Sequence, residues 1–327
     1  MWMRVAARRF GIASAAAFLA GFVVVSDGAR ADAAKPSPLV STEWLRDRLN
    51  DPALLVLDVR SAIDGGGKEA FVEGHIPGAV HTDYDKAGWR VTRKDIPFML
   101  PTLPELEKLV GELGIDEDKT VVVVPAGVHA TDFGSAARVY WTLKYLGHEK
   151  VAILDGGFAA WKSERNKIET GERRPSPTIF TAAINKKLLT EVTDLETLDG
   201  QATLIDARAP SFFFGKEKSD RAAGYGHIPG AINVDSAELY DPVRNRLKPK
   251  ELLDSAFGEM SNGPVVTYCN TGHWAATDWF VLSEILGHKD ASLYAGSMVE
   301  WTADARRPIQ SQRTKWDDLK KFLRLGS

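Results

Sequence analysis

The sequence predicts an α/β protein of two tandem domains, each a parallel sheet covered by helices on both faces. Three observations support this. Sequence blocks recur in the same order in both halves of the chain. Continuous apolar runs such as LLVLDV (54–59) and VVVV (121–124) are typical of strands buried on both faces of a parallel sheet. Stretches of helical periodicity alternate with these runs, which is the pattern of an α/β fold.

Four blocks carry the internal repeat. They are LLVLDVRSA (54–62) with TLIDARAPS (203–211), GHIPGAV (74–80) with GHIPGAI (226–232), TVVVVPAG (120–127) with PVVTYCNT (264–271), and YLGHEKVAILDGGFAAW (145–161) with ILGHKDASLYAGSMVEW (285–301). Four ordered matches indicate a duplicated domain of about 140 residues. We predict domains over 38–161 and 179–320, joined by a charged, proline-bearing linker over 162–178.

Within a copy, local signals place the elements. LPELEKLVGELG (103–114) has one apolar face and a glycine stop, so it predicts a helix. Val265–Tyr268 predicts a strand, and 275–286 predicts a helix that ends at Gly287. GHIPGA predicts a turn into the next strand. His75 and His227 lie in these turns, either as ligands or as residues that hold the turn. We favour the second role because no other histidine stands at ligand spacing.

Composition excludes several classes of protein. The 327 residues are 44% apolar and 26% charged, with a net charge of −3. These values are typical of a globular protein and give no electrostatic footprint for nucleic acid. A single cysteine excludes an internal disulfide and any site built from several thiolates.

The amino terminus has the pattern of a secretory signal peptide. Three arginines precede the uncharged stretch 10–25, and Ala29-Arg30-Ala31 follows. We predict a signal peptide over 1–31 with cleavage near Ala31, and a periplasmic or secreted mature protein free of the membrane. The alternatives are a frayed tail or an uncleaved anchor.

Cys269 stands at the end of a predicted strand and before a predicted helix. In an open α/β sheet, ligands bind at the carboxyl ends of the strands. The unpaired N–H groups of a loop entering a helix attract an anion and would stabilise a thiolate. The residues that form this cradle are Asn270, Thr271, Gly272, His273 and Trp274. We therefore predict that Cys269 is a nucleophile, against the alternative that it is a small buried apolar residue.

The first copy serves as an internal control. Pro125 follows its strand in place of a cysteine, and about four more residues precede the matching glycine, Gly147. We therefore expect a longer loop without a thiol, and a first domain that is inactive.

The DxR pairs, both GHIPGA turns, the cysteine loop and LGHxxVxxLDGGFxAW together resemble the tandem-domain rhodanese family, the thiosulfate and 3-mercaptopyruvate sulfurtransferases, here of an exported bacterial type. The resemblance covers roughly residues 38–310. It implies that Cys269 takes a sulfane sulfur from a small-molecule donor as a persulfide and passes it to a thiophilic acceptor such as cyanide or a thiol. It also implies framework positions at Asp206 and Arg208, and a reaction without metal, flavin or nucleotide.

The chain departs from the family pattern in its charges. Thiosulfate-specific members carry Arg-Lys after the cysteine and mercaptopyruvate-specific members carry Gly-Ser-Gly-Val-Thr, whereas this loop reads Asn-Thr-Gly-His-Trp. Phe212 occupies the position of a further substrate-binding arginine. Candidates to replace the missing charges are His273, Lys216, Lys218 and Arg221, the last three of which are alternatively a solvated loop.

Two loop residues have open alternatives. His273 either donates to the substrate and titrates near neutral pH, or caps the helix or faces solvent. Trp274 either walls the pocket or packs into the core.

Three other functions compete with sulfur transfer from thiosulfate or a related donor. A Cys-x5-Arg phosphatase is excluded because Ala275 stands where the arginine would be. A persulfide carrier without turnover passes through the same Cys269 persulfide, so it remains an alternative, as does 3-mercaptopyruvate sulfurtransferase activity.

Overall fold

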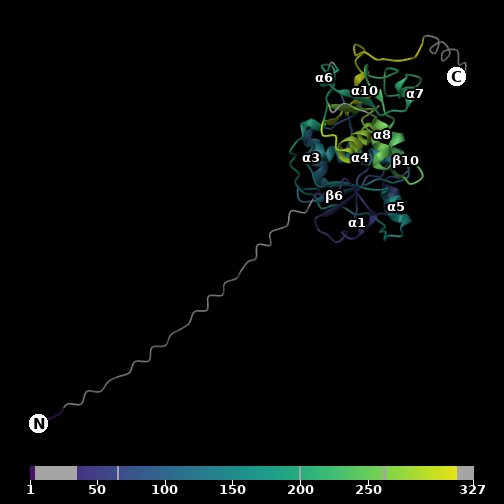
Figure 1. Cartoon of the computed structure of the whole chain (residues 1–327). Coiled ribbons are helices and arrows are strands. Elements are labelled where there is room, and N and C mark those ends of the chain that lie inside the picture. The colour runs from purple at the N-terminus through teal and green to yellow at the C-terminus, as the bar shows by residue number, and fades with distance from the viewer. Residues whose placement is uncertain (4–34, 65, 199, 259, 261–262, 315–327) are drawn as a thin grey trace. The chain divides into compact units, whose positions relative to one another are not determined.

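The computed structural model of the protein contains two parallel sheets, one in each half of the chain (Figure 1). The first has the order β1-β7-β6-β2-β3, with strands Leu39–Val40, Val151–Leu154, Thr120–Val124, Leu54–Asp58 and Val80–His81. The second has the order β13-β12-β8-β9, with strands Ala291–Leu293, Val265–Tyr268, Thr203–Asp206 and Ile232–Asn233. Every pairing within these two sheets is parallel, so the predicted fold class is confirmed.

The structure describes residues 1–3, 35–64, 66–198, 200–258, 260 and 263–314. Most of the predicted signal peptide lies outside these residues, so cleavage near Ala31 stays a prediction. From Lys35 onward the chain forms one compact unit. Within the described ranges no helix has the length and apolar character that crossing a membrane requires.

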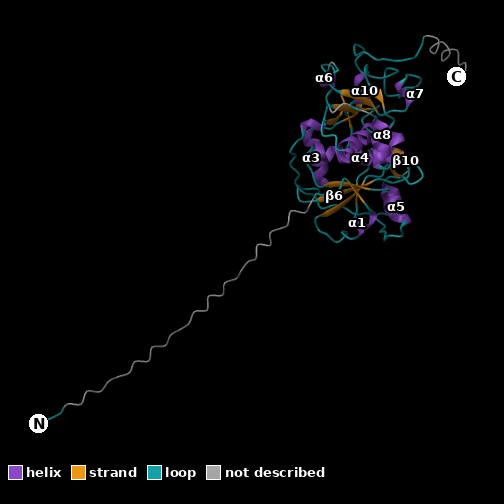
Figure 2. Ribbon diagram, viewed as in Figure 1, coloured by secondary structure: helices purple, strands orange, loops and turns teal. Residues whose placement is uncertain are grey.

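Helices cover both faces of each sheet. Those of the first half are α1 (Thr42–Arg46), η1 (Ala62–Asp64), α2 (Lys68–Glu73), α3 (Leu103–Glu112), α4 (Ala130–Tyr145) and α5 (Gly157–Ser163). Those of the second half are η2 (Lys186–Leu188), α6 (Val192–Leu195), α7 (Pro210–Phe213), η3 (Ser236–Leu239), α8 (Lys250–Phe257), α9 (Trp274–Phe280), the π-helical η4 (Val281–Leu286) and α10 (Ser297–Trp301). Figure 2 shows a helical layer that includes α3, α4 and α8 between the two sheets.

The valines of β6 explain why this sheet is buried on both sides. Successive side chains of a strand point to opposite faces. Val121 and Val123 therefore join the cluster shared with the middle helices, while Val122 and Val124 join a second cluster beneath α1, α2 and α5. In the second half, Val266 and Tyr268 pack against the outer helices in the same way.

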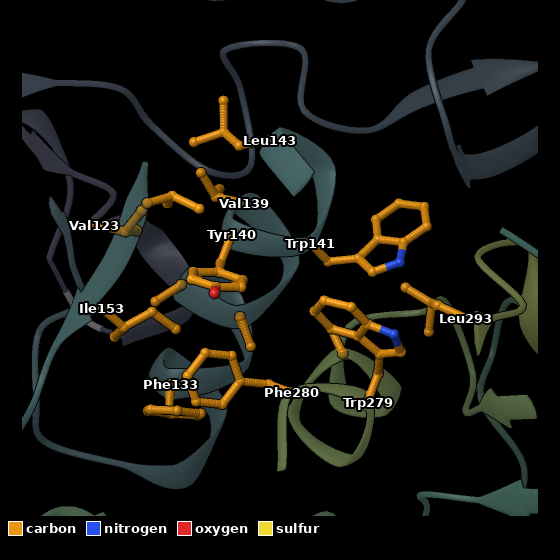
Figure 3. Close-up of a cluster of buried hydrophobic side chains, with 14 of the residues drawn as sticks. Val123, Phe133, Val139, Tyr140, Trp141, Leu143, Ile153, Trp279, Phe280 and Leu293 are labelled. Atoms are coloured by element: carbon orange, nitrogen blue, oxygen red, sulfur yellow. The ribbon is translucent and has the colours of Figure 1, made fainter. Parts of the chain in front are cut away.

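The middle layer forms one core that spans both halves (Figure 3). Helix α4 packs directly on α9. The ring of Phe280 lies edge-on to the rings of Tyr140 and Phe133, with centroids 5.0 and 5.6 Å apart. The two repeats are thus joined by aromatic packing between the helices that follow β6 and β12.

The loop lengths correct one expectation. Residues 125–129 connect β6 to α4, and 269–273 connect β12 to α9, so the two loops are equally long. The additional residues of the first copy lie in its helix, because α4 has 16 residues whereas α9 and η4 have 7 and 6. The number of residues from the end of the strand to Gly147 counts both the loop and the helix. It therefore could not show which of the two contains the additional residues.

Two antiparallel hairpins were not predicted. They are β4 with β5 (Val91–Arg93, Ile96–Met99) and β10 with β11 (Tyr240–Asp241, Arg246–Leu247). Their strands have two to four residues and lack the extended alternation that marks a strand in sequence. Each hairpin follows the GHIPGA turn of its own repeat, at corresponding positions.

The predicted linker, 162–178, packs along the first domain. The backbones of Glu169 and His75 exchange two hydrogen bonds of 2.9 Å, and the Thr178 N–H donates to the Gly111 carbonyl at 2.8 Å. Gln310 pairs with His227 in the same way in the second half.

Candidate active site

Cys269 follows β12, a central strand of the second sheet, at its carboxyl end. It lines a cavity of about 320 Å³, together with Asn270, Thr271, His273 and Trp274 of its own loop. Only 1% of the residue is exposed, so the thiol is reached through this cavity rather than from the open surface. The structure therefore brings four of the five predicted loop residues to one cavity with the cysteine.

The start of α10 supports the loop from behind. The Cys269 N–H donates to Ser297 Oγ at 3.1 Å, and Ser297 Oγ donates to the Tyr294 carbonyl at 2.9 Å. Ser297 has φ of 52°, a left-handed conformation that is uncommon outside glycine. The N–H groups of Met298 and Val299 bond to the carbonyls of Cys269 and Asn270, each at 3.0 Å. These bonds hold the first two loop residues in one conformation.

The sulfur atom accepts one backbone hydrogen bond, and two buried arginines bind its loop. The Thr271 N–H donates to Sγ at 3.4 Å. The guanidinium groups of Arg138 and Arg208 are both buried and both interact electrostatically with Cys269. The loop thus directs one N–H at the sulfur and is itself held by two arginines.

The framework pair occupies the base of the loop. Arg208 is buried and forms an ion pair with Asp206, with Nη2 2.6 Å from Oδ2. Its Nη1 donates to Asn270 Oδ1 at 3.3 Å and its Nη2 to the Gly226 carbonyl at 2.8 Å. Arg208 therefore ties the cysteine loop to the GHIPGA turn.

The first repeat has the same pair without a thiol. Arg60 binds Asp58 at 2.7 Å and the Gly74 carbonyl at 2.8 Å. In both turns the histidine Nδ1 lies within hydrogen-bonding distance of a carbonyl, at 2.8 Å for His75 and 2.7 Å for His227. Both imidazoles also stack on a phenylalanine, which agrees with their role in holding the turn.

His273 is buried, which corrects the expectation that it faces solvent or caps the helix. Its Nδ1 lies 3.0 Å from the Tyr84 hydroxyl of the first domain, and its side chain makes no capping bond to α9. Burial, together with the positive charge of Arg90, lowers the pKa of His273 to about 3. The imidazole is therefore neutral at physiological pH and does not titrate near neutrality.

Trp274 is partly exposed, lines the cavity and also packs against the shared core, so the structure combines the two predicted alternatives. Phe212, at the position where family members carry an arginine, packs edge-on against Trp274 with centroids 6.2 Å apart. This side of the site is therefore apolar where the family pattern places a cation.

The three proposed cations do not enter the cavity. Lys216 and Arg221 are exposed, and Lys218 Nζ donates to the Ala222 carbonyl at 2.8 Å. The cavity lining includes Ser219 from this segment but none of these three side chains. These three residues therefore fit the alternative that their segment is a solvated loop.

The first domain supplies the opposite wall, which sequence reasoning missed. Its contributions are Ile63, Asp85, Arg90, Phe98 and Thr131. Asp85, Arg90 and Phe98 belong to the hairpin segment after the first GHIPGA turn, and Thr131 lies in α4. No local pattern could have identified them, because their place depends on how the two domains pack.

A second cation from the first domain holds the cysteine loop. Arg138 of α4 is fully buried, and its Nη1 donates to the Gly272 carbonyl at 2.9 Å. Burial lowers its pKa to about 10, so it remains charged at neutral pH. Gly272 has φ of 69°, and a Cβ there would overlap Arg138 Nη1 and lie 2.5 Å from the Ala295 carbonyl oxygen. Only glycine fits this position.

The part of the chain that the structure describes contains no cluster of three or more histidine, cysteine, aspartate or glutamate residues arranged to hold a metal ion. The described lining of the cavity brings together one thiol, the loop residues and the Arg90 guanidinium.

Comparison with known proteins agrees with this architecture. The model of the rhodanese-like domain matches the chain twice, over residues 41–164 and 190–304. The 3-mercaptopyruvate sulfurtransferase of Escherichia coli (strain K12) is 34% identical over 283 residues, covering 83% of this chain and 97% of that protein. The thiosulfate sulfurtransferase of Rattus norvegicus is 32% identical over 279 residues, covering 80% of this chain and 91% of that protein.

A solved structure gives the same result. SseA of Escherichia coli, a 3-mercaptopyruvate sulfotransferase, superposes with a TM-score of 0.67 at 30% identity, over 82% of this chain and 100% of that one. Two domain matches, a shared fold and relatives that align over most of their own length lead to one conclusion: the chain belongs to the rhodanese-like family and contains two rhodanese-like domains in tandem.

Proposed function

We propose that the protein is a sulfurtransferase that moves sulfur from a small anionic donor, thiosulfate or 3-mercaptopyruvate, to a thiophilic acceptor through a persulfide on Cys269. The observation that carries the proposal is the position of the only cysteine. It directly follows β12 and lines a cavity, with a backbone N–H donating to its sulfur and two buried arginines bonded to its loop. The curated relatives include enzymes for each of the two donors.

The reaction with thiosulfate has two steps. The Cys269 thiolate attacks the outer sulfur, the S–S bond of thiosulfate breaks, and sulfite leaves with the electron pair. Cyanide or a thiolate then attacks the terminal sulfur of the persulfide, which regenerates the Cys269 thiolate. With 3-mercaptopyruvate, the C–S bond breaks instead, and the departing carbon takes up the thiol proton to give pyruvate.

The neighbours of Cys269 suit both steps. A persulfide on Cys269 places negative charge on a sulfur in the cavity, where the Thr271 N–H and the positive charges of Arg138 and Arg208 stabilise it. The neutral imidazole of His273 adds no charge at physiological pH.

The first prediction is that Cys269→Ser abolishes persulfide formation without unfolding the protein, because a hydroxyl cannot accept the sulfur. Wild type mixed with either donor should gain one sulfur atom, about 32 Da, mapped by mass spectrometry to Cys269. Sulfur transfer that persists in the serine variant would show that another group carries the sulfur.

Turnover separates an enzyme from a carrier. With an excess of thiosulfate and cyanide, an enzyme releases many equivalents of thiocyanate, whereas a carrier loads once and stops. The same assay with 3-mercaptopyruvate, read as pyruvate, ranks the two donors by kcat/KM. Pro125→Cys, combined with Cys269→Ser, is the matched control. It puts a thiol at the corresponding position of the first repeat and should not restore activity.

A further inference from the structure

The charges around the cavity are unevenly distributed between the domains. Among the described residues that line it, Arg90 is the single cation and Asp85 the single anion, and both come from the first domain. The second domain contributes the thiol and neutral side chains, since His273 carries no charge at physiological pH. A charge that recognises an anionic donor inside the cavity must therefore come from the domain without a cysteine.

Arg90 is held rigidly at this wall. Its side chain is only 5% exposed, and Nη2 binds Asp85 Oδ1 at 2.8 Å. The guanidinium carbon lies 4.3 Å from the ring centroid of Tyr84 and 4.9 Å from that of Phe98. An arginine paired on one edge and stacked on two rings loses little further conformational freedom when a ligand binds.

Within the described part of the chain, the bond to Asp85 leaves other donors of Arg90 without a partner. Nε is buried without a hydrogen bond, and no bond from Nη1 to another described residue is formed. Buried polar groups are almost always paired, and an arginine prefers a carboxylate or another oxyanion. An anionic ligand in the cavity would complete the coordination of this guanidinium.

We propose that Arg90 binds the anionic group of the sulfur donor, so that the first domain supplies the recognition site and the second supplies the nucleophile. This inference rests on the proposed sulfur transfer and names the residue that selects the donor.

The same geometry indicates which donor fits better. Asp85 neutralises part of the charge of Arg90, and the other walls include the apolar side chains Ile63, Phe98 and Trp274. Arg90 is the one cation among the described lining residues and shares its charge with Asp85, so a dianion such as thiosulfate is compensated there less fully than a monoanion. The cavity favours an organic monoanion whose carboxylate meets Arg90 and whose sulfur meets Cys269, as in a mercapto acid.

Alkylation of Cys269 tests the recognition step without sulfur transfer. Iodoacetate and iodoacetamide give the same S–C bond and release iodide, but only iodoacetate carries a carboxylate. In Arg90→Gln, the ratio of the iodoacetate to the iodoacetamide rate constant should fall about tenfold, because a charge-assisted bond to the carboxylate is lost. The iodoacetamide rate should stay within about twofold of wild type.

Arg244→Gln is the matched control. Arg244 lies on the corresponding hairpin of the second domain, pairs with Asp241 at 3.4 Å, and is 74% exposed. This variant should keep the wild-type ratio. Arg90→Lys keeps the positive charge but not the planar guanidinium that binds a carboxylate through two N–H groups. Its ratio of iodoacetate to iodoacetamide rate constants should therefore fall between those of wild type and Arg90→Gln. If Arg90→Gln does not fold, Arg90→Lys is tested in its place.

Steady-state kinetics give the second readout. Arg90→Gln should raise KM for 3-mercaptopyruvate about tenfold. We expect wild type to have a higher kcat/KM for 3-mercaptopyruvate than for thiosulfate, and the ratio of these two values should be smaller in the variant. Two results would overturn the proposal. An unchanged alkylation ratio at unchanged rates would show that Arg90 does not bind the carboxylate, and an equal fall in both rates would show that its role is structural. Wild type that forms no persulfide with either donor would instead contradict the proposed sulfur transfer, whatever the alkylation ratio shows.

Discussion

His273 illustrates how burial changes the chemistry of a single residue. In sequence it stands four residues after the cysteine, where it suggests a proton donor that titrates near neutral pH. In the structure its ring lies beneath the domain interface against Tyr84, with the centroids 5.4 Å apart. Burial and the charge of Arg90 then lower its pKa to about 3. Its role is to hold Tyr84 and the loop in place as a neutral group.

This shift makes stability depend on pH. The unfolded chain binds a proton on His273 near pH 6.5, whereas the folded protein binds it only near pH 3. The stability is therefore fully present above pH 6.5 and is lost as the pH falls toward 3. Between pH 7 and pH 5, the free energy of unfolding of wild type should fall by about 2 kcal/mol more than that of His273→Asn. Urea titrations at several pH values measure this difference, and parallel curves for the two proteins would contradict it.

Individual residues differ in how far the sequence predicts them. Cys269, the two acid–arginine pairs and the GHIPGA histidines could be predicted because each stands at a fixed place beside a strand or turn. Arg90 and Arg138 could not. Their functional neighbours, Cys269 and Gly272, are more than a hundred residues away in sequence and belong to the other domain.

At the scale of the element, a glycine stands on each side of the helical segment formed by α9 and η4. Gly272 precedes α9 and has φ of 69°, and Gly287 follows η4 and has φ of 81°. A Cβ at Gly272 would meet Arg138 and Ala295, whereas a Cβ at Gly287 meets no atom within 4 Å. The two positions share a backbone conformation and differ in the space around them.

This pair gives a controlled prediction. Gly287→Ala should destabilise the protein by about 1 kcal/mol, because alanine is disfavoured at positive φ, and Gly272→Ala should destabilise it by more, because its Cβ would also overlap Arg138 and the Ala295 carbonyl. Only Gly272→Ala should also displace Arg138 and the loop, and it should lower kcat/KM at least tenfold. Thermal unfolding and the thiocyanate assay measure the two effects. Equal activity in the two variants would show that the contact with Arg138 does not position the loop.

The strands and longer helices were predictable from periodicity, but the π-helical turn η4 and the two hairpins were not. Residues 281–286 keep an apolar pattern that a regular helix would also satisfy. The hairpins are too short to show strand alternation, and one of them, with the residues just before it, contributes Asp85, Arg90 and Phe98 to the cavity wall. The part of the cavity wall that the sequence did not predict is therefore also the part with the weakest pattern of secondary structure in the sequence.

At the scale of the whole molecule, the repeat predicted two domains and the structure adds that they share one core. Phe133 and Tyr140 of α4 pack on Phe280 of α9, inside a cluster that reaches both sheets. Neither half covers this aromatic surface by itself. The repeat could not reveal this contact, since it matches each half to the other and says nothing of how they pack.

The shared core predicts a single cooperative unfolding transition. Phe280→Ala should lower the free energy of unfolding by about 3–5 kcal/mol, as is usual for removing a buried aromatic ring. Amide hydrogens of β6 and β12 should lose protection together in this variant, although Phe280 belongs to the second domain. Phe71→Ala gives the complementary test, because Phe71 lies in the outer cluster of the first domain: it should lower the protection of β12 in the second domain as well as that of β6. Two separate transitions in denaturant would show that the domains unfold independently.

The hydrogen bond from Arg138 to the Gly272 carbonyl has a consequence for the history of the chain. After a tandem duplication, two identical copies are at first equivalent. Once a side chain of the copy without a thiol supports the loop of the other, that equivalence has ended. Selection then acts on the pair as one unit, and a deletion that spares the reactive half would still remove its scaffold.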